Sequence, residues 1–130
     1  MLIAGLVFAG LAALVHVYIF ALESLRFDQP ATWKVFGVKG PEEAEILKPL
    51  FYNQGFYNLF LAIGTAAGIC FTAGGNHDAG IALVTLCCAS MVAAALILVS
   101  SDSSKARGAI VQGTMPAIAL LWLLVRVVAG

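Results

Sequence analysis

Charge is scarce in this sequence. Of its 130 residues only 11% are Asp, Glu, Lys or Arg, and the seven acidic residues balance the seven basic ones. Nucleic-acid binding requires a cluster of basic residues, and no basic stretch exists here. No segment outside the long apolar runs is large enough to build a soluble core. The sequence therefore excludes nucleic acid as a partner and an ordinary soluble domain as the fold.

Signatures of familiar active sites and cofactors are also missing. There is no glycine-rich phosphate loop, no His-Glu-x-x-His, no nucleophile elbow and no haem Cys-x-x-Cys-His. Cys70, Cys87 and Cys88 are an odd number within apolar runs, which indicates buried thiols rather than disulfides or metal ligands. His77 and Asp78 offer two metal ligands, but an isolated pair more often forms a turn. We expect neither a cofactor nor a metal ion.

Long apolar runs, by contrast, make up much of the chain. Hydrophobic residues make up 62% of the chain, and four runs without charge cover residues 2–22, 56–73, 79–99 and 109–125. At about 1.5 Å per residue, each run can cross the roughly 30 Å hydrocarbon layer or nearly so. Lipid leaves backbone groups no water, so the runs should be helical. The prediction is an all-α integral membrane four-helix bundle forming one transmembrane domain, residues 1–130.

Two glycines in the second run predict close helix packing. Gly64 and Gly68 form a small-xxx-small pair, the pattern that lets another membrane helix approach closely.

The connection between the first two runs, residues 23–55, carries most of the charge and is predicted to cover the bundle like a lid. Pro41, Glu42 and Glu43 are typical of a helix start, and Lys48 with Pro49 of a helix end. We therefore expect a short amphipathic helix in this first loop.

The distribution of basic residues predicts the orientation in the membrane. Six basic residues flank the first and third connections: Arg26, Lys34, Lys39, Lys48, Lys105 and Arg107. Apart from the N-terminal amine, the opposite side has only Arg126. Because cytoplasmic loops are enriched in Lys and Arg, both connections are predicted to be cytoplasmic and both termini outside.

His16 and Glu23 are the strongest candidates for a functional role. They lie seven residues apart on one face of the first helix, so His16 is roughly 10 Å deeper than Glu23. Ionisable groups inside a bilayer are costly and indicate function by default. The alternative is that Glu23 is a solvated helix end and His16 a neutral side chain bonded to an amide.

Other polar residues border the same half of the membrane. Asn53, Gln54, Tyr57 and Asn58 crowd the start of the second helix, and Gln112 lies just inside the fourth, four residues before Pro116. Asp102 follows the third helix. This pattern predicts a polar pocket between the helices that opens toward the cytoplasm. Alternatively, the main role of Asn53, Gln54 and Asn58 is structural, to form hydrogen bonds between helices.

Several of these residues fall in blocks that resemble a known family. The blocks are residues 16–19, 22–23, 34–37, 53–62 and 111–117, of which Asn-Gln-Gly-x-Tyr-Asn is the most specific. Over nearly its whole length the chain resembles a family of small four-span bacterial membrane proteins named domain of unknown function 1304. The resemblance implies four spans and a multi-pass protein of the bacterial cytoplasmic (inner) membrane, with no established activity. It marks these motif positions: His16, Glu23, Asn53, Gln54, Tyr57, Asn58 and Gln112.

The leading hypothesis is a pocket that binds a small, largely lipid-soluble molecule. A stronger form of this hypothesis adds acid–base chemistry on the bound molecule. His16 would transfer the proton, and Glu23 would orient or charge the His16 side chain. The ligand would be hydrogen-bonded by Asn53, Gln54, Tyr57, Asn58 and Gln112.

Two other classes of function remain open. The chain is either an accessory or structural subunit that packs on a partner membrane protein or on another copy of itself, or a small transporter. Transport is the weaker of the two because Glu23 is predicted at a helix end rather than in mid-span. In each of these three classes of function, membrane lipid surrounds the protein and is a partner of it.

Overall fold

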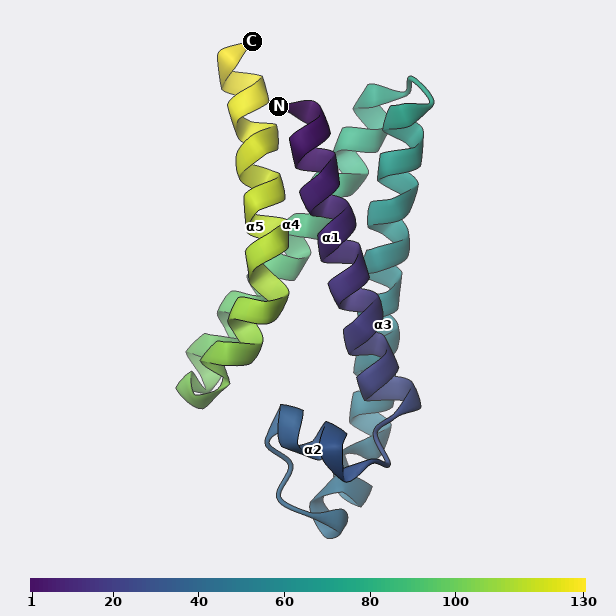
Figure 1. The fold of residues 1–130 in the computed structure, drawn as a ribbon, viewed down its shortest axis with the longest axis vertical. Helices are drawn as coiled ribbons and strands as arrows, with labels where there is room; N and C mark the ends of the chain where they lie inside the picture. Colours follow the sequence, from purple (N-terminus) through teal and green to yellow (C-terminus); the bar gives the residue numbers. More distant parts are fainter.

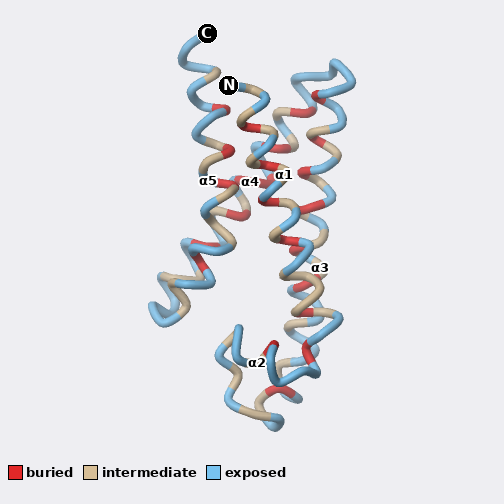
Figure 2. Tube along the Cα trace, in the orientation of Figure 1, coloured by how far each residue is buried: buried red, intermediate tan, exposed pale blue.

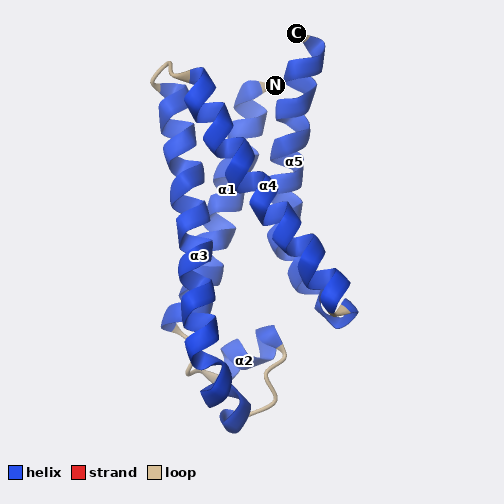
Figure 3. Ribbon diagram, turned by 180° about the vertical axis from the view of Figure 1, so that it is seen from behind, coloured by secondary structure: helices blue, strands red, loops and turns tan.

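All 130 residues are described by the structure, a computed structural model made of helices joined by short turns (Figures 1 and 3). In chain order the elements are α1 (Leu2–Phe20), a π-helical turn η1 (Ala21–Leu25), α2 (Pro30–Phe36), α3 (Pro41–Ala73), α4 (His77–Ser101), a 3-10 turn η2 (Ser103–Lys105) and α5 (Ala106–Ala129). Four helical segments, namely α1 with η1, α3, α4, and η2 with α5, are long and apolar enough to cross a membrane. The predicted all-α bundle is confirmed.

The first connection differs from the sequence prediction in one respect. A helix does begin at Pro41, but it passes through Pro49 and continues to Ala73 as one element, α3. Proline removes the hydrogen bond to the carbonyl four residues earlier, here Glu45. Glu45 and Pro49 are both exposed, so water can satisfy that carbonyl outside the membrane. The predicted helix end at Lys48–Pro49 is therefore wrong, and the short helix of the first loop is instead α2.

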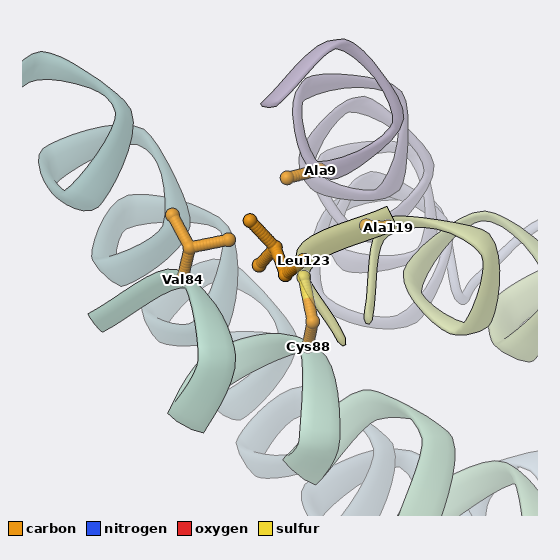
Figure 4. Packing of buried hydrophobic residues seen from close by; sticks show 5 residues of the cluster. All are labelled: Ala9, Val84, Cys88, Ala119 and Leu123. Carbon is orange, nitrogen blue, oxygen red and sulfur yellow. The ribbon is translucent and has the colours of Figure 1, made fainter. Parts of the chain in front are cut away.

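Small residues bring the helices together in the half of the bundle that holds the two termini. A Cβ atom on Gly68 would lie 2.8 Å from the carbonyl oxygen of Gly80 on α4, and one on Gly64 would lie 2.6 Å from Cys87 Sγ. The close approach predicted for this glycine pair is confirmed. The core here joins α1, α4 and α5 through a buried cluster (Figure 4): Ala9, Val84, Cys88, Ala119 and Leu123.

The other half of the bundle is more open. Away from the termini, α4 and α5 diverge from α1 and α3, and α5 changes direction near its middle (Figures 1 and 3). Pro116 lies inside α5 and is fully buried, which fits a bend caused by a missing backbone hydrogen bond. The α4–α5 connection at this end is exposed (Figure 2).

The first loop lies on the end of α3 rather than extending into solvent. Phe51 of α3 stacks on Phe27 with ring centroids 4.5 Å apart and also contacts Phe36 of α2. Lys48 forms an exposed ion pair with Asp28 at 2.7 Å. These contacts hold α2 across the open end of the bundle.

One contact links α2 to the diverging pair of helices. Lys105 Nζ, in η2, donates a hydrogen bond to the carbonyl oxygen of Phe36 at the C-terminus of α2. A lysine at a helix C-terminus satisfies a free carbonyl and interacts favourably with the helix dipole. α2 therefore joins the ends of both helix pairs.

Candidate functional site

His16 is almost fully enclosed within the bundle. Its side chain is 1% exposed, and its Nδ1 lies 2.9 Å from the carbonyl oxygen of Ala12 one turn earlier. A carbonyl only accepts, so Nδ1 carries the proton and Nε2 of the neutral ring presents a lone pair. No side-chain nitrogen or oxygen that is fully shielded from solvent lacks a hydrogen-bond partner in this structure. Nε2 of His16 makes no hydrogen bond, so it cannot be one of the fully shielded atoms. Nε2 therefore reaches the accessible surface.

Glu23 is buried as well, in the π-helical turn that ends the first span. Its side chain is 4% exposed, and Oε1 accepts a hydrogen bond of 2.7 Å from Asn58 Nδ2 on α3. The alternative that Glu23 is a solvated helix end is thus wrong. Single π-helical turns are rare and frequently occur at functional sites. Oε2 has no partner, so by the same reasoning as for His16 it is accessible.

Asn58 connects the two helices through its amide group. Besides Glu23, Asn58 Nδ2 donates to the carbonyl oxygen of Gln54 at 3.2 Å. The side chain is 7% exposed, and its Oδ1 makes no hydrogen bond and is accessible. Three buried residues therefore each leave one polar atom unpaired: His16 Nε2, Glu23 Oε2 and Asn58 Oδ1.

Gly55 makes the contact between Glu23 and Asn58 possible. A Cβ atom there would lie 2.0 Å from Ser24 Oγ and 3.1 Å from Glu23 Cβ, so only glycine lets the end of the first span approach α3 this closely. Ser24 Oγ also donates a hydrogen bond of 2.8 Å to the carbonyl oxygen of Tyr52. Sequence reasoning missed Gly55 and Ser24. The glycine within the Asn-Gln-Gly block was the one available signal.

The remaining predicted residues of α3 are exposed. Asn53 and Gln54 are exposed, and Tyr57 is 59% exposed. Gln54 precedes Asn58 by one turn on the same side of α3.

No hydrogen bond joins Gln112 or Asp102 to Glu23 or Asn58. Gln112 is half-buried on α5, between Ala109 and Pro116 of the buried face. Asp102 is exposed, and it accepts hydrogen bonds from the Ser104 amide and hydroxyl, which hold the pKa of its carboxyl below the usual range. Of the side chains predicted to converge from four helices, those of Glu23 and Asn58 are joined by a hydrogen bond, and α4 and α5 diverge at this end of the bundle (Figure 1).

The cysteine and metal candidates are separate from this cluster. Cys87 and Cys88 are buried thiols as predicted, whereas Cys70 is exposed on α3. His77 and Asp78 form the first turn of α4, capped by Asn76 Oδ1, which accepts from the Ala79 amide at 3.3 Å. No group of three His, Cys, Asp or Glu residues could hold a metal ion.

Comparison with known families agrees with this architecture. The model of a family described as protein of unknown function (DUF1304) matches residues 10–124. The chain belongs to this family. The match includes His16, Glu23, Gly55 and Asn58, and it confirms the resemblance found in the sequence. No curated protein and no solved structure matches the chain. The description of DUF1304 names no activity, so the chemistry has to be argued from the site itself.

Proposed function

We propose that this DUF1304 protein binds a small, largely lipid-soluble molecule beside Glu23 and Asn58, with His16 deeper along the same helix. The observation that carries this proposal is the set of three unpaired but accessible polar atoms on buried side chains. Because these three atoms keep some accessible surface, they can still gain a hydrogen bond, and leaving one unpaired away from water would cost about 1–3 kcal/mol. A bound molecule, or water in its absence, would satisfy them.

The depth of the cluster supports a ligand that enters from the membrane. α3 has 33 residues and is about 50 Å long, roughly 20 Å more than the hydrocarbon layer. If Ala73 lies at one surface of that layer, the other surface is crossed about 20 residues earlier, near Asn53. Asn58 then lies about 8 Å inside the layer. An amphiphile can place its polar head at this depth and leave its apolar part in lipid.

His16 supports the stronger form of the proposal, acid–base chemistry on the bound molecule. Its Nε2 lone pair can accept a proton, and histidine is the side chain whose ordinary pKa is nearest neutrality. Asn53, Gln54, Tyr57 and Gln112 remain proposed ligand-binding residues of the rim, where exposed or half-buried amides and a phenol can hydrogen-bond a head group.

A structural subunit is the second candidate function, and the Glu23–Asn58 hydrogen bond favours it. Such interhelical bonds stabilise membrane proteins without any ligand, by about 0.6 kcal/mol on average. An apolar groove of about 450 Å³ between α4 and α5, lined by Ala95, Ile110 and Gly113 among others, offers a surface for a partner helix.

For orientation we propose the cytoplasmic membrane of a bacterium, with both termini outside. Both connections rich in basic residues, residues 26–40 and 102–107, lie at the same end of the bundle, opposite the termini (Figure 1). That arrangement supports the positive-inside prediction.

The binding proposal is tested by analysing what copurifies with the protein. We would extract wild type and Asn58→Leu from native membranes in mild detergent and identify released small molecules by mass spectrometry. The expected result is a stoichiometric small molecule with wild type that is depleted from Asn58→Leu. Ser90→Ala is the matched control, because the Ser90 hydroxyl bonds only the Leu86 carbonyl of its own helix. A stoichiometric protein partner with no small molecule would instead support the subunit.

A further inference from the structure

We propose that the molecule bound at this site is a lipophilic amine, whose protonated primary or secondary ammonium group binds Glu23 Oε2 and Asn58 Oδ1. This inference rests on the proposed binding function and assigns its ligand class. It follows from two properties of the cluster, the hydrogen-bonding character of its unpaired atoms and the absence of a cation that would compensate an ionised Glu23.

When Glu23 is ionised, all the unpaired atoms of the cluster are acceptors. The Asn58 amide nitrogen is already committed to Glu23 Oε1 and to the Gln54 carbonyl, which leaves only its carbonyl oxygen. Glu23 as a carboxylate has only acceptor oxygens, and one is taken. His16 has committed its proton to Ala12, so Nε2 also accepts. A ligand that fits must donate hydrogen bonds. A ketone, carboxylate or phosphate group, which only accepts, would leave the cluster unsatisfied.

The cluster also lacks a positive charge. The only ion pair in the structure is Lys48 with Asp28, and both are exposed. Lys105 is engaged with the Phe36 carbonyl of α2, and Arg26, three residues beyond Glu23, is exposed. Glu23 therefore has one amide partner and no cation, so its ionised form would be a buried charge without compensation. Burying an unpaired charge is strongly unfavourable, and an ammonium group would supply both the missing charge and the missing donors.

The position of the cluster selects an amphiphilic amine over a hydrophilic one. At about 8 Å inside the hydrocarbon layer, an ammonium group must be carried by an apolar body that prefers lipid. The hydrogen bond of 2.7 Å between Asn58 Nδ2 and Glu23 Oε1 holds the amide group and the carboxyl group side by side. One ammonium group with two or three N–H donors can therefore contact both.

The test compares two probes that differ only in their head group, n-decylamine and n-decanol. Binding of each is measured by competition or calorimetry at pH 7 with the full-length protein in phosphatidylcholine nanodiscs, with empty nanodiscs subtracted. We expect wild type to bind the amine at least about tenfold more tightly than the alcohol, about 1.4 kcal/mol. Glu23→Gln should abolish that preference, Glu23→Asp should retain part of it, and Ser90→Ala should leave it unchanged.

The outcomes separate this inference from the function on which it rests. Equal, saturable binding of both probes to wild type would overturn the amine assignment and leave the binding function standing. No binding of either probe above empty nanodiscs would overturn both. If Glu23→Gln fails to fold, as judged by circular dichroism and gel filtration, wild type with decyltrimethylammonium decides instead. This cation has no N–H donor, so we expect it to bind at least about tenfold more weakly than decylamine, and equal binding would overturn the assignment.

Discussion

Replacing Gly55 by alanine tests whether the close approach of α1 and α3 holds the cluster together. The new Cβ would lie 2.0 Å from Ser24 Oγ and 3.1 Å from both Ser24 Cβ and Glu23 Cβ. The hydroxyl can rotate away only by giving up its hydrogen bond to the Tyr52 carbonyl, worth about 1 kcal/mol. The remaining contacts force α1 outward by a few tenths of an ångström, and overpacking of this kind costs about 1–3 kcal/mol.

Part of that cost is offset because alanine is a better helix former than glycine by about 1 kcal/mol. We therefore expect Gly55→Ala to lower the free energy of unfolding by about 1–3 kcal/mol and to weaken ligand binding, because the displacement lengthens the Glu23–Asn58 hydrogen bond. Unfolding is measured by titration with a denaturing detergent, and binding with the decylamine probe.

Two variants sharpen the interpretation. Gly10→Ala is the matched control on α1, since its nearest neighbour would be Ile69 Cδ1 at 3.8 Å, an ordinary contact. Ser24→Ala combined with Gly55→Ala removes the 2.0 Å overlap and should recover part of the lost stability. The reasoning is refuted if Gly55→Ala is as stable as Gly10→Ala and binds the probe equally well.

Three further predictions concern the packed half of the bundle and its loops. Gly68→Ala places a Cβ 2.8 Å from the Gly80 carbonyl, so the unfolding free energy should fall by about 1–3 kcal/mol in the same titration, and an unchanged value would contradict the close crossing of α3 and α4. Lys105→Met removes the hydrogen bond to α2, and residues 30–40 should then exchange amide hydrogens faster while the membrane helices keep their protection. Asp102 has a lowered pKa, so its carboxylate cap on Ser104 is stable above the ordinary value of about 3.9 and is lost as pH falls through the lower folded value. NMR-detected exchange of the Ser104 amide at decreasing pH should show this loss, whereas Asp102→Asn should show no such pH dependence.

The architecture was predictable because its causes are local in sequence. Apolar runs of membrane length fix the number of helices, and the Gly64–Gly68 spacing correctly predicts a close helix crossing. The continuation of α3 through Pro49 was not predictable from propensity. Proline is unfavourable inside a helix, yet here it lies on an exposed face where water can replace the lost hydrogen bond.

The candidate site was predictable only in part, because it depends on how helices bend and pack. The position of ionisable residues in or beside an apolar run singled out His16 and Glu23, and both are buried in the structure. No local pattern could show that α4 and α5 diverge and leave Gln112 and Asp102 without a hydrogen bond to Glu23. Likewise, the choice of Asn58 over Asn53 as the partner of Glu23 depends on which face of α3 meets α1, and Gly55 determines that face.

The most direct test of the proposed site is an experimental structure of the protein extracted with its native lipids. We predict non-protein density within hydrogen-bonding distance of Glu23 Oε2 and Asn58 Oδ1, continuing as an apolar body into the bilayer. A structure in which His16 Nε2, Glu23 Oε2 and Asn58 Oδ1 are all paired with protein groups would contradict a ligand site and leave only a helix-packing role for these residues.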